Sequence, residues 1–316
     1  MKAASITLGF TVFRPETVPF AARAMHGHDL VVLEEPVTPG FEEMLKGELA
    51  IDEYLMLTDF EFPEYARLQC QSLKELFAGG AEVLQVHPWM DELVAIHEFL
   101  AAGNGPGDIP RHGTAWPVYS REREWTGKLL DFYQASAESD FQKTLQSVLE
   151  FARIDAEKIR DMDAARVKAV VRAAQGRSKV YVECGVIHQL MVGSCLRAFG
   201  RERVRTLYLM EDVCKDRYGV RRLLPPGDVL TLMYLHRAPR DSQRELLLAA
   251  RSLIYSRLME KEEIFECASR FPHLDTEATV LALVGSMDLS QCRSLFKKLR
   301  HAGTKEALAL LRRSGH

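Results

Sequence analysis

Carboxylate and histidine side chains follow several apolar, strand-like segments of this chain. Because the carboxyl ends of parallel strands meet at one edge of a sheet, where ligands bind in open α/β proteins, such side chains are candidates for a single site. Carboxylates beside histidines can perform general acid–base catalysis or bind a divalent metal. The residues at these positions are Glu34, Glu35, His87, Glu183, His188 and Asp212.

A structural role competes with a functional one at each of these positions. An acidic residue at a strand end often caps the next helix or forms a surface salt bridge, so the group is more informative than any one member. Glu34 and Glu35 are adjacent, and neighbouring residues in a strand point to opposite faces. We therefore expect only one of the two to face the site.

The elements that would position these residues alternate between strand-like and helix-like segments. The strand-like segments are 6–10, 29–33, 81–86, 179–183, 204–210 and 229–235. This alternation predicts an α/β fold with a parallel-rich central sheet of about six strands. Helix-forming residues predict a helical insertion at 119–176 within an α/β core at 1–240. Residues 241–316 are expected to form a helical C-terminal extension packed on that core.

Two motifs occur in the order of a known family. A helix carrying Arg160-Asp161-Met162 precedes a strand that ends in the turn Gly185-Val186-Ile187-His188. Upstream, a strand with Gly9 is followed by a helix and an apolar strand that ends in Glu34. Over roughly residues 5–200 the chain resembles the TraB/PrgY/GumN family, whose superfamily includes the Tiki proteases, the ChaN-like proteins and the erythromycin esterases.

The resemblance implies a hydrolase of an ester or amide, with a small-molecule or peptide substrate. His188 would be the base or a metal ligand, Glu34 a water-orienting carboxylate or a metal ligand, and Arg160 the cation that stabilises negative charge. The implied cofactor, if there is one, is a divalent metal held by His188 and Glu34.

The chain departs from the family pattern at its first motif. Gly9 is followed three residues later by Val12 where the family has histidine, and valine can neither bind a metal nor move a proton. If the reaction of the family needs both histidines, this protein has lost it, or His87 or Glu35 substitutes from a neighbouring strand, with Glu183 and Asp212 as further supporting carboxylates.

Three hypotheses about function therefore stay open. The first is the hydrolase, and the second is a catalytically degenerate member that binds a small ligand or a partner protein. The third is an enzyme with Cys184 as its nucleophile, although a free cysteine at the end of an apolar strand is usually a small buried hydrophobe.

Composition limits the other classes of protein. The 316 residues include 41 Lys and Arg against 44 Asp and Glu, a net charge of −3, which argues against sequence-independent nucleic-acid binding. No apolar run is long enough to cross a membrane, and six cysteines without a CxxC pair favour a reduced, cytoplasmic protein. Apolar stripes after residue 241, such as Leu253-Ile254, are candidates for core packing or a homodimer contact.

Overall fold

The chain forms two compact units in a computed structural model that describes residues 4–58, 60–138, 140–239, 241–264, 268–299, 302–304 and 306–307. The first unit combines Met1–Ser120 with Arg160–Val213, and the second combines Arg121–Ile159 with Cys214–His316. This division differs from the expected boundary at residue 240. The physical reason is that the middle of the helical insertion shares one apolar core with the C-terminal helices.

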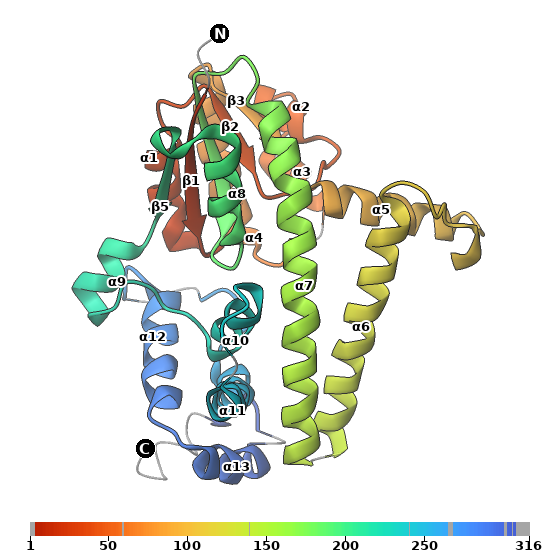
Figure 1. The fold of residues 1–316 in the computed structure, drawn as a ribbon. Coiled ribbons are helices and arrows are strands. Elements are labelled where there is room, and N and C mark those ends of the chain that lie inside the picture. Colours follow the sequence, from red (N-terminus) through yellow and green to blue (C-terminus); the bar gives the residue numbers. More distant parts are fainter. Residues whose placement is uncertain are drawn as a thin grey trace. The chain divides into compact units, whose positions relative to one another are not determined.

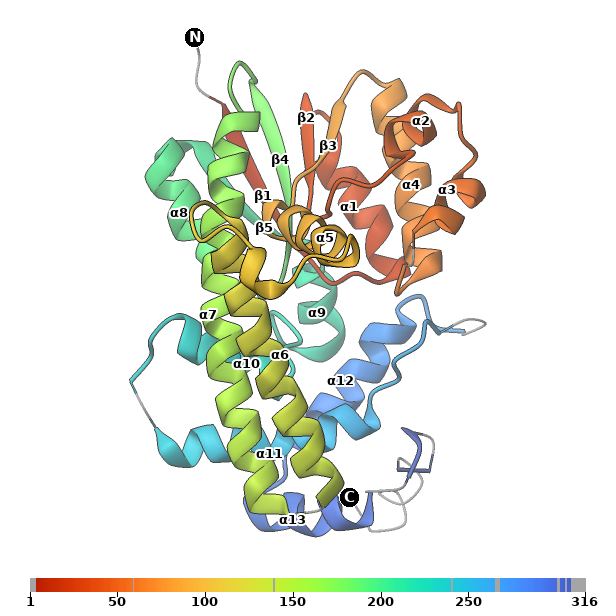
Figure 2. The same cartoon turned by 90° about the vertical axis from the view of Figure 1, so that its right-hand side faces the viewer.

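The first unit contains a parallel five-stranded sheet in the order β3-β2-β4-β1-β5. The strands are β1 (Ser5–Thr11), β2 (Leu30–Leu33), β3 (Glu82–Gln85), β4 (Lys179–Gly185) and β5 (Val204–Tyr208). The predicted α/β class is confirmed. β4, which follows the helical insertion, lies between β1 and β2 and therefore joins the two halves of the sheet. The sheet is drawn in Figure 1, and Figure 2 labels β4 in this position.

The sixth predicted strand, 229–235, is wrong, because these residues belong to helix α10 (Pro226–Leu235). A short apolar run cannot be assigned to strand or helix by periodicity alone. Here Pro226 opens the helix and Asp228 lies in its first turn, and both are favoured at a helix N-terminus. The sheet therefore has five strands within the part of the chain that the structure describes.

One face of the sheet is covered by α1 (Val18–Met25), α2 (Phe41–Lys46), α3 (Ile51–Leu57) and α4 (Pro63–Ala78) (Figure 2). A short 3₁₀ turn, Pro15–Thr17, precedes α1. Val31, Leu33 and Tyr181 point from the strands into this layer. Strand residues of alternate parity therefore belong to this face, as expected of a sheet buried on both sides.

The other face packs against the C-terminal half of α7 (Phe141–Ala173) and against α8 (Leu190–Phe199). Leu8 and Val182 of the strands meet Val170 of α7 in this layer. The remaining elements of this part of the chain are α5 (Pro88–Ala101), a 3₁₀ turn at Pro106–Asp108, α6 (Ala115–Glu138), a 3₁₀ turn at Arg201–Arg203 and α9 (Glu211–Tyr218). The sheet is thus sandwiched between helical layers.

The second unit is helical. It contains residues 121–159 of α6 and α7 together with α10, α11 (Ser242–Leu258), α12 (Pro272–Gly285) and α13 (Leu289–Lys298). Leu253 and Ile254, which belong to the stripe singled out in the sequence, are buried in the core of this unit. No described helix of the chain is both long and apolar enough to cross a membrane.

Candidate functional site

Glu34 and His188 are held by the carboxyl ends of the adjacent strands β2 and β4. Glu34 directly follows β2, and β4 ends at Gly185. The backbone then turns sharply, because the amide of His188 donates to the carbonyl of Gly185 at 3.0 Å. The amide of Gly185 itself donates to Glu34 Oε2 at 2.8 Å. The Gly-x-x-His turn therefore brings a histidine and a carboxylate acceptor together.

The imidazole of His188 lies between two carboxylates. Its Nε2 is 2.9 Å from Glu34 Oε1, and its Nδ1 is 2.5 Å from Asp163 Oδ1. Asp163 comes from α7. The second carboxylate oxygen of Asp163, Oδ2, is buried and has no hydrogen-bond partner among the described residues. His188 thus connects the sheet edge to α7.

Arg166, also on α7, fixes Glu34 from the other side. Its Nη1 donates to Glu34 Oε2 at 2.6 Å, its Nη2 to the carbonyl of Glu183 at 2.7 Å, and its Nε to the carbonyl of Val86 at 3.1 Å. The guanidinium therefore ties together the ends of β2, β3 and β4. Its planar fork of donors suits this task better than a lysine would.

Burial and the charges of neighbouring groups determine the protonation of Glu34 and His188. Burial alone would raise the pKa of Glu34, but the positive charges of His188 and Arg166 outweigh it and hold that pKa well below its usual range. Burial alone would lower the pKa of His188, but the charge of Glu34 and the hydrogen bond to Asp163 raise it to about 10. At neutral pH, His188 is therefore an imidazolium that donates from both ring nitrogens.

Glu183 forms a second buried carboxyl on the opposite face of the sheet. Its Oε2 accepts from the amide of Glu34 at 3.3 Å, and its Oε1 accepts from Gln69 Nε2 of α4 at 3.2 Å. Burial, with a further contribution from the charge of Glu35, raises the pKa of Glu183 to about 8. Glu183 supports the backbone of Glu34 and is predominantly protonated at neutral pH.

Of the three residues that the resemblance implied, Glu34 and His188 are in contact in the structure. Arg160 is not the arginine that contacts Glu34. The arginine that contacts Glu34 is Arg166, six residues further along α7 than the predicted Arg160. Asp163 was missed as well. Both missed residues interrupt an otherwise apolar buried stripe of α7 that includes Val170. Two charged residues three positions apart within an otherwise apolar helix face are a pattern that can be recognised in the sequence.

The other candidates lie at different positions. His87 is buried at the start of α5, where its Nδ1 accepts from the amide of Met90, and burial lowers its pKa to about 4. Glu35 points away from Glu34 and accepts from Gln85 at 3.0 Å, as the alternation of strand residues predicts. Asp212 is exposed in the first turn of α9. Of these three, His87 interacts electrostatically with the Glu34–His188 pair.

Glu34 and His188 do not fit the divalent metal that the resemblance implied. Both carboxylate oxygens of Glu34 and both ring nitrogens of His188 are already engaged within the protein, and a cation there would lie beside the Arg166 guanidinium. Within the described ranges, no group of three or more His, Cys, Asp or Glu residues is arranged to hold a metal ion.

Cys184 does not provide the partly exposed thiolate that a cysteine nucleophile requires. It is completely buried on the face of the sheet that packs against α7 and α8. Burial raises the pKa of its thiol well above the usual range, so the sulfur stays protonated at neutral pH. The structure therefore gives the cysteine hypothesis no support.

We expect the stability of the fold to fall as pH rises from about 6.5 to about 10, because the raised pKa values of Glu183 and His188 act in the same direction there. Between about pH 4 and 6.5 the lowered pKa of His87 makes stability rise with pH and opposes the effect of Glu183. Glu183, raised from 4.5 to about 8, stabilises the fold fully below pH 4.5 and loses that contribution by about pH 8. His188, raised from 6.5 to about 10, stabilises it fully below pH 6.5 and loses that contribution by about pH 10. Urea unfolding at several pH values measures this slope.

Two variants separate these contributions to the pH dependence. Glu183→Gln should flatten the slope at the acidic end of the window, and His188→Gln should flatten it at the alkaline end. Asp212→Asn, an exposed carboxylate on α9, is the matched control and should follow the wild type. Wild-type slopes in both buried variants would contradict the assignment.

Comparison with known proteins gives one relative of similar length. The chain is 28% identical over 288 residues to an uncharacterized protein of Archaeoglobus fulgidus, and the match covers 91% of this chain and 96% of that protein. Neither the known protein families nor the solved structures give a match. The similarity to the archaeal protein thus extends over most of both compact units.

Proposed function

We propose that this protein is a hydrolase of a small ester or amide, with Glu34, His188, Asp163 and Arg166 as its acid–base centre. The observation that carries the proposal is the imidazole of His188 between two carboxylates at the carboxyl ends of parallel strands. Ligands of open α/β sheets bind at that edge.

The chemistry follows from which atoms carry protons. A water that enters between Glu34 Oε1 and His188 Nε2 gives a proton to Glu34 as it attacks the substrate carbonyl. His188 donates its Nε2 proton to the leaving alcohol or amine, and Glu34 then returns a proton to His188, which restores the starting state. Asp163 keeps the ring oriented through Nδ1, and Arg166 keeps Glu34 in place.

The burial of the centre favours a small substrate over a peptide. The side chains of Glu34 and His188 are 8% and 9% exposed, and that of Arg166 is 3% exposed. A carbonyl that reaches His188 Nε2 must therefore enter a confined space, in which water is limited and electrostatic interactions are strong.

A panel of 4-nitrophenyl esters and 4-nitroanilides tests the proposal. We expect the wild type to hydrolyse at least one short-chain substrate and His188→Gln to lose about 10²- to 10⁴-fold of that rate, the usual contribution of an acid–base group. Arg160→Gln is the control, because Arg160 lies on the same helix, six residues before Arg166. Circular dichroism confirms that the variants are folded.

Two results would contradict the hydrolase. One is the absence of turnover by the wild type on the whole panel, and the other is a wild-type rate in His188→Gln. A large loss of rate in a folded Arg160→Gln variant would instead return the arginine role to the residue that the resemblance implied.

The second candidate function is ligand binding without catalysis. It is favoured by the saturated hydrogen bonding of His188 and by Val12 at the position where the family has histidine. In that case the wild type shows no turnover, but a small carboxylate or amide that enters the site raises the melting temperature, and His188→Gln abolishes this effect.

A further inference from the structure

Three strongly exposed apolar side chains belong to neighbouring segments of the first unit. The exposed fractions are 87% for Met56, 72% for Val37 and 60% for Leu57. A single exposed apolar residue is ordinary on a protein surface, whereas a group of them marks an interaction site more often. We refer to Val37, Met56 and Leu57 as the α3 patch, because two of them end α3.

Local contacts hold the segment 37–40 against α3. The hydroxyl groups of Thr38 and Tyr54, a residue of α3, share a hydrogen bond at 2.7 Å. A Cβ on Gly40 would lie 3.2 Å from Leu57 Cδ1, so this segment also contacts the end of the helix. In Figure 2, α2 and α3 lie at the right-hand margin of the first unit. The three side chains of the α3 patch therefore belong to one small region of the surface.

The part of the sequence that contains the α3 patch is strongly acidic. Residues 37–67 include eight Asp and Glu against two Lys and Arg, whereas the whole chain has 44 against 41. Both cations, Lys46 and Arg67, already form ion pairs with carboxylates of this segment. The region around the patch therefore carries an excess of negative charge.

Acidic and apolar side chains lie one turn apart on the exposed face of α3. Asp52 precedes Met56 by four residues, and Glu53 precedes Leu57 by four, and all four side chains are exposed. Residues at this spacing are neighbours on a helix surface. A second helix that carries lysine or arginine one turn away from leucine presents the complementary pairs.

This combination of side chains restricts the kind of partner. Nucleic acids and anionic membrane surfaces are repelled by the carboxylates. A basic amphipathic helix matches both properties, and the flexible side chain of methionine adapts to its apolar face. We propose that the α3 patch binds a basic amphipathic helix of a partner protein. Met56 and Leu57 contact its apolar side chains, and the carboxylates of α3 lie beside its lysines or arginines.

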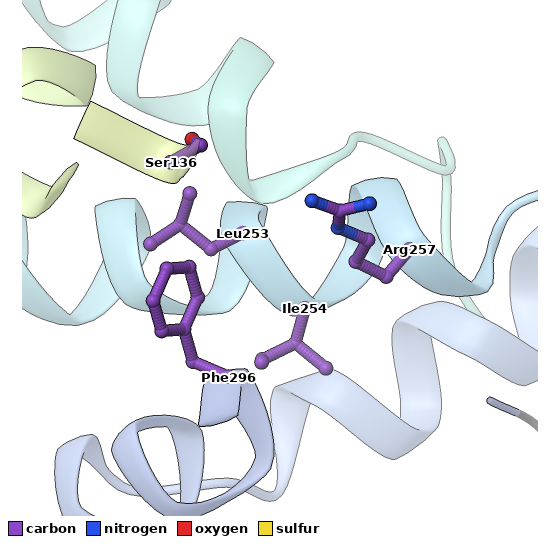
Figure 3. A pocket seen from close by; sticks show the side chains of 5 residues that line it. All are labelled: Ser136, Leu253, Ile254, Arg257 and Phe296. Atoms are coloured by element: carbon purple, nitrogen blue, oxygen red, sulfur yellow. The ribbon is translucent and has the colours of Figure 1, made fainter. Parts of the chain in front are cut away.

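The second unit offers no equivalent surface among its described residues. Leu130 on α6 is as exposed as Leu57, at 60%, but the charges beside it are of both signs, and Lys128 pairs with Asp131 at 3.0 Å. A pocket of this unit, drawn in Figure 3, has a volume of about 10 Å³. It holds no more than about one water molecule and cannot receive a side chain of a partner.

Fluorescence anisotropy with defined peptides tests the proposal on the full chain. The probe is a labelled peptide of about 15 residues, built from leucine and lysine with the leucines at helical spacing. The comparison peptide has glutamate in place of every lysine. We expect the lysine peptide to bind less tightly as the NaCl concentration rises, and the glutamate peptide to bind at least about tenfold more weakly.

Two variants locate the binding. Met56→Ser combined with Leu57→Ser should weaken the lysine peptide about tenfold or more, because less apolar surface is buried in the complex. Glu53→Gln should make binding less dependent on salt, and its side chain can still accept the hydrogen bond from the amide of Ala50. Leu130→Ser is the matched control and should bind like the wild type. Circular dichroism confirms that the variants are folded.

Any of three results overturns the proposal. The first is a wild type that binds neither peptide or binds both equally. The second is wild-type affinity for the lysine peptide in the folded double variant of Met56 and Leu57, because the peptide would then bind elsewhere. The third is binding of phosphatidylcholine vesicles in preference to the lysine peptide, which would assign the α3 patch to a membrane.

Discussion

Replacement of Arg166 by methionine is expected to destabilise the first unit by about 3–5 kcal/mol, the usual cost of breaking a buried ion pair from one side. Methionine matches much of the length of arginine but donates no hydrogen bond. It would leave Glu34 with one fewer counter-charge and the carbonyls of Val86 and Glu183 without the guanidinium donors. Each of these groups is then buried at the junction of three strands.

Urea unfolding followed by circular dichroism and by tryptophan fluorescence measures this effect. Two of the three tryptophans, Trp89 and Trp116, belong to the first unit, so the fluorescence change reports largely on the unit that carries the site. Arg172→Met is the matched control, because Arg172 is an exposed arginine near the end of the same helix, and its replacement should cost less than about 1 kcal/mol. Equal losses in both variants would contradict the role of Arg166.

Gly9→Ala is expected to be the second severe substitution, with a loss of at least about 3 kcal/mol, at the upper end of overpacking effects. A Cβ on Gly9 would overlap the hydroxyl and ring carbons of Tyr181, a residue of the neighbouring strand β4. Tyr181 is completely buried and packs edge-on against His28, so the ring has little room to move. The glycine is therefore required by close packing of side chain on backbone.

A double-mutant cycle isolates this contact. Tyr181→Val removes the ring and should itself cost about 3–5 kcal/mol because it leaves a cavity. In that background Gly9→Ala should cost less than about 1 kcal/mol, so that the two effects are far from additive. Gly227→Ala is the control substitution, since its Cβ would lie 3.6 Å from Ser252 in ordinary contact. Additive losses would show that the ring is not the obstacle.

The sheet and part of the site could be predicted from the sequence because they depend on local patterns. Apolar runs bounded by turn residues located all five strands, and the residues at the strand ends included Glu34 and His188. The parallel arrangement followed from the alternation of strand and helix. The motif Gly185-x-x-His188 also gave the correct turn, because its geometry depends on neighbouring residues alone.

The features that the sequence did not predict depend on contacts between segments that are distant in the chain. Whether Arg160 or Arg166 reaches Glu34 is set by the rotation of α7 over the sheet, and a difference of six residues changes the height along the helix by about 9 Å. The division of the chain into two compact units could not be predicted for the same reason, because α6 and α7 each contribute residues to both units. The segment 229–235 was ambiguous, since a fully apolar strand and a buried helical turn share one composition.

The position of β4 at the centre of the sheet has a consequence for the synthesis of the chain. β1 and β2 are neighbours of β4 and not of each other, so a nascent chain that ends near residue 120 has no partner to join its two strands. The sheet closes only after residues 179–185 have left the ribosome, and this event also carries His188 to Glu34. Until then the face of β1 and β2 that packs against α7 and α8 is open to chaperones and proteases.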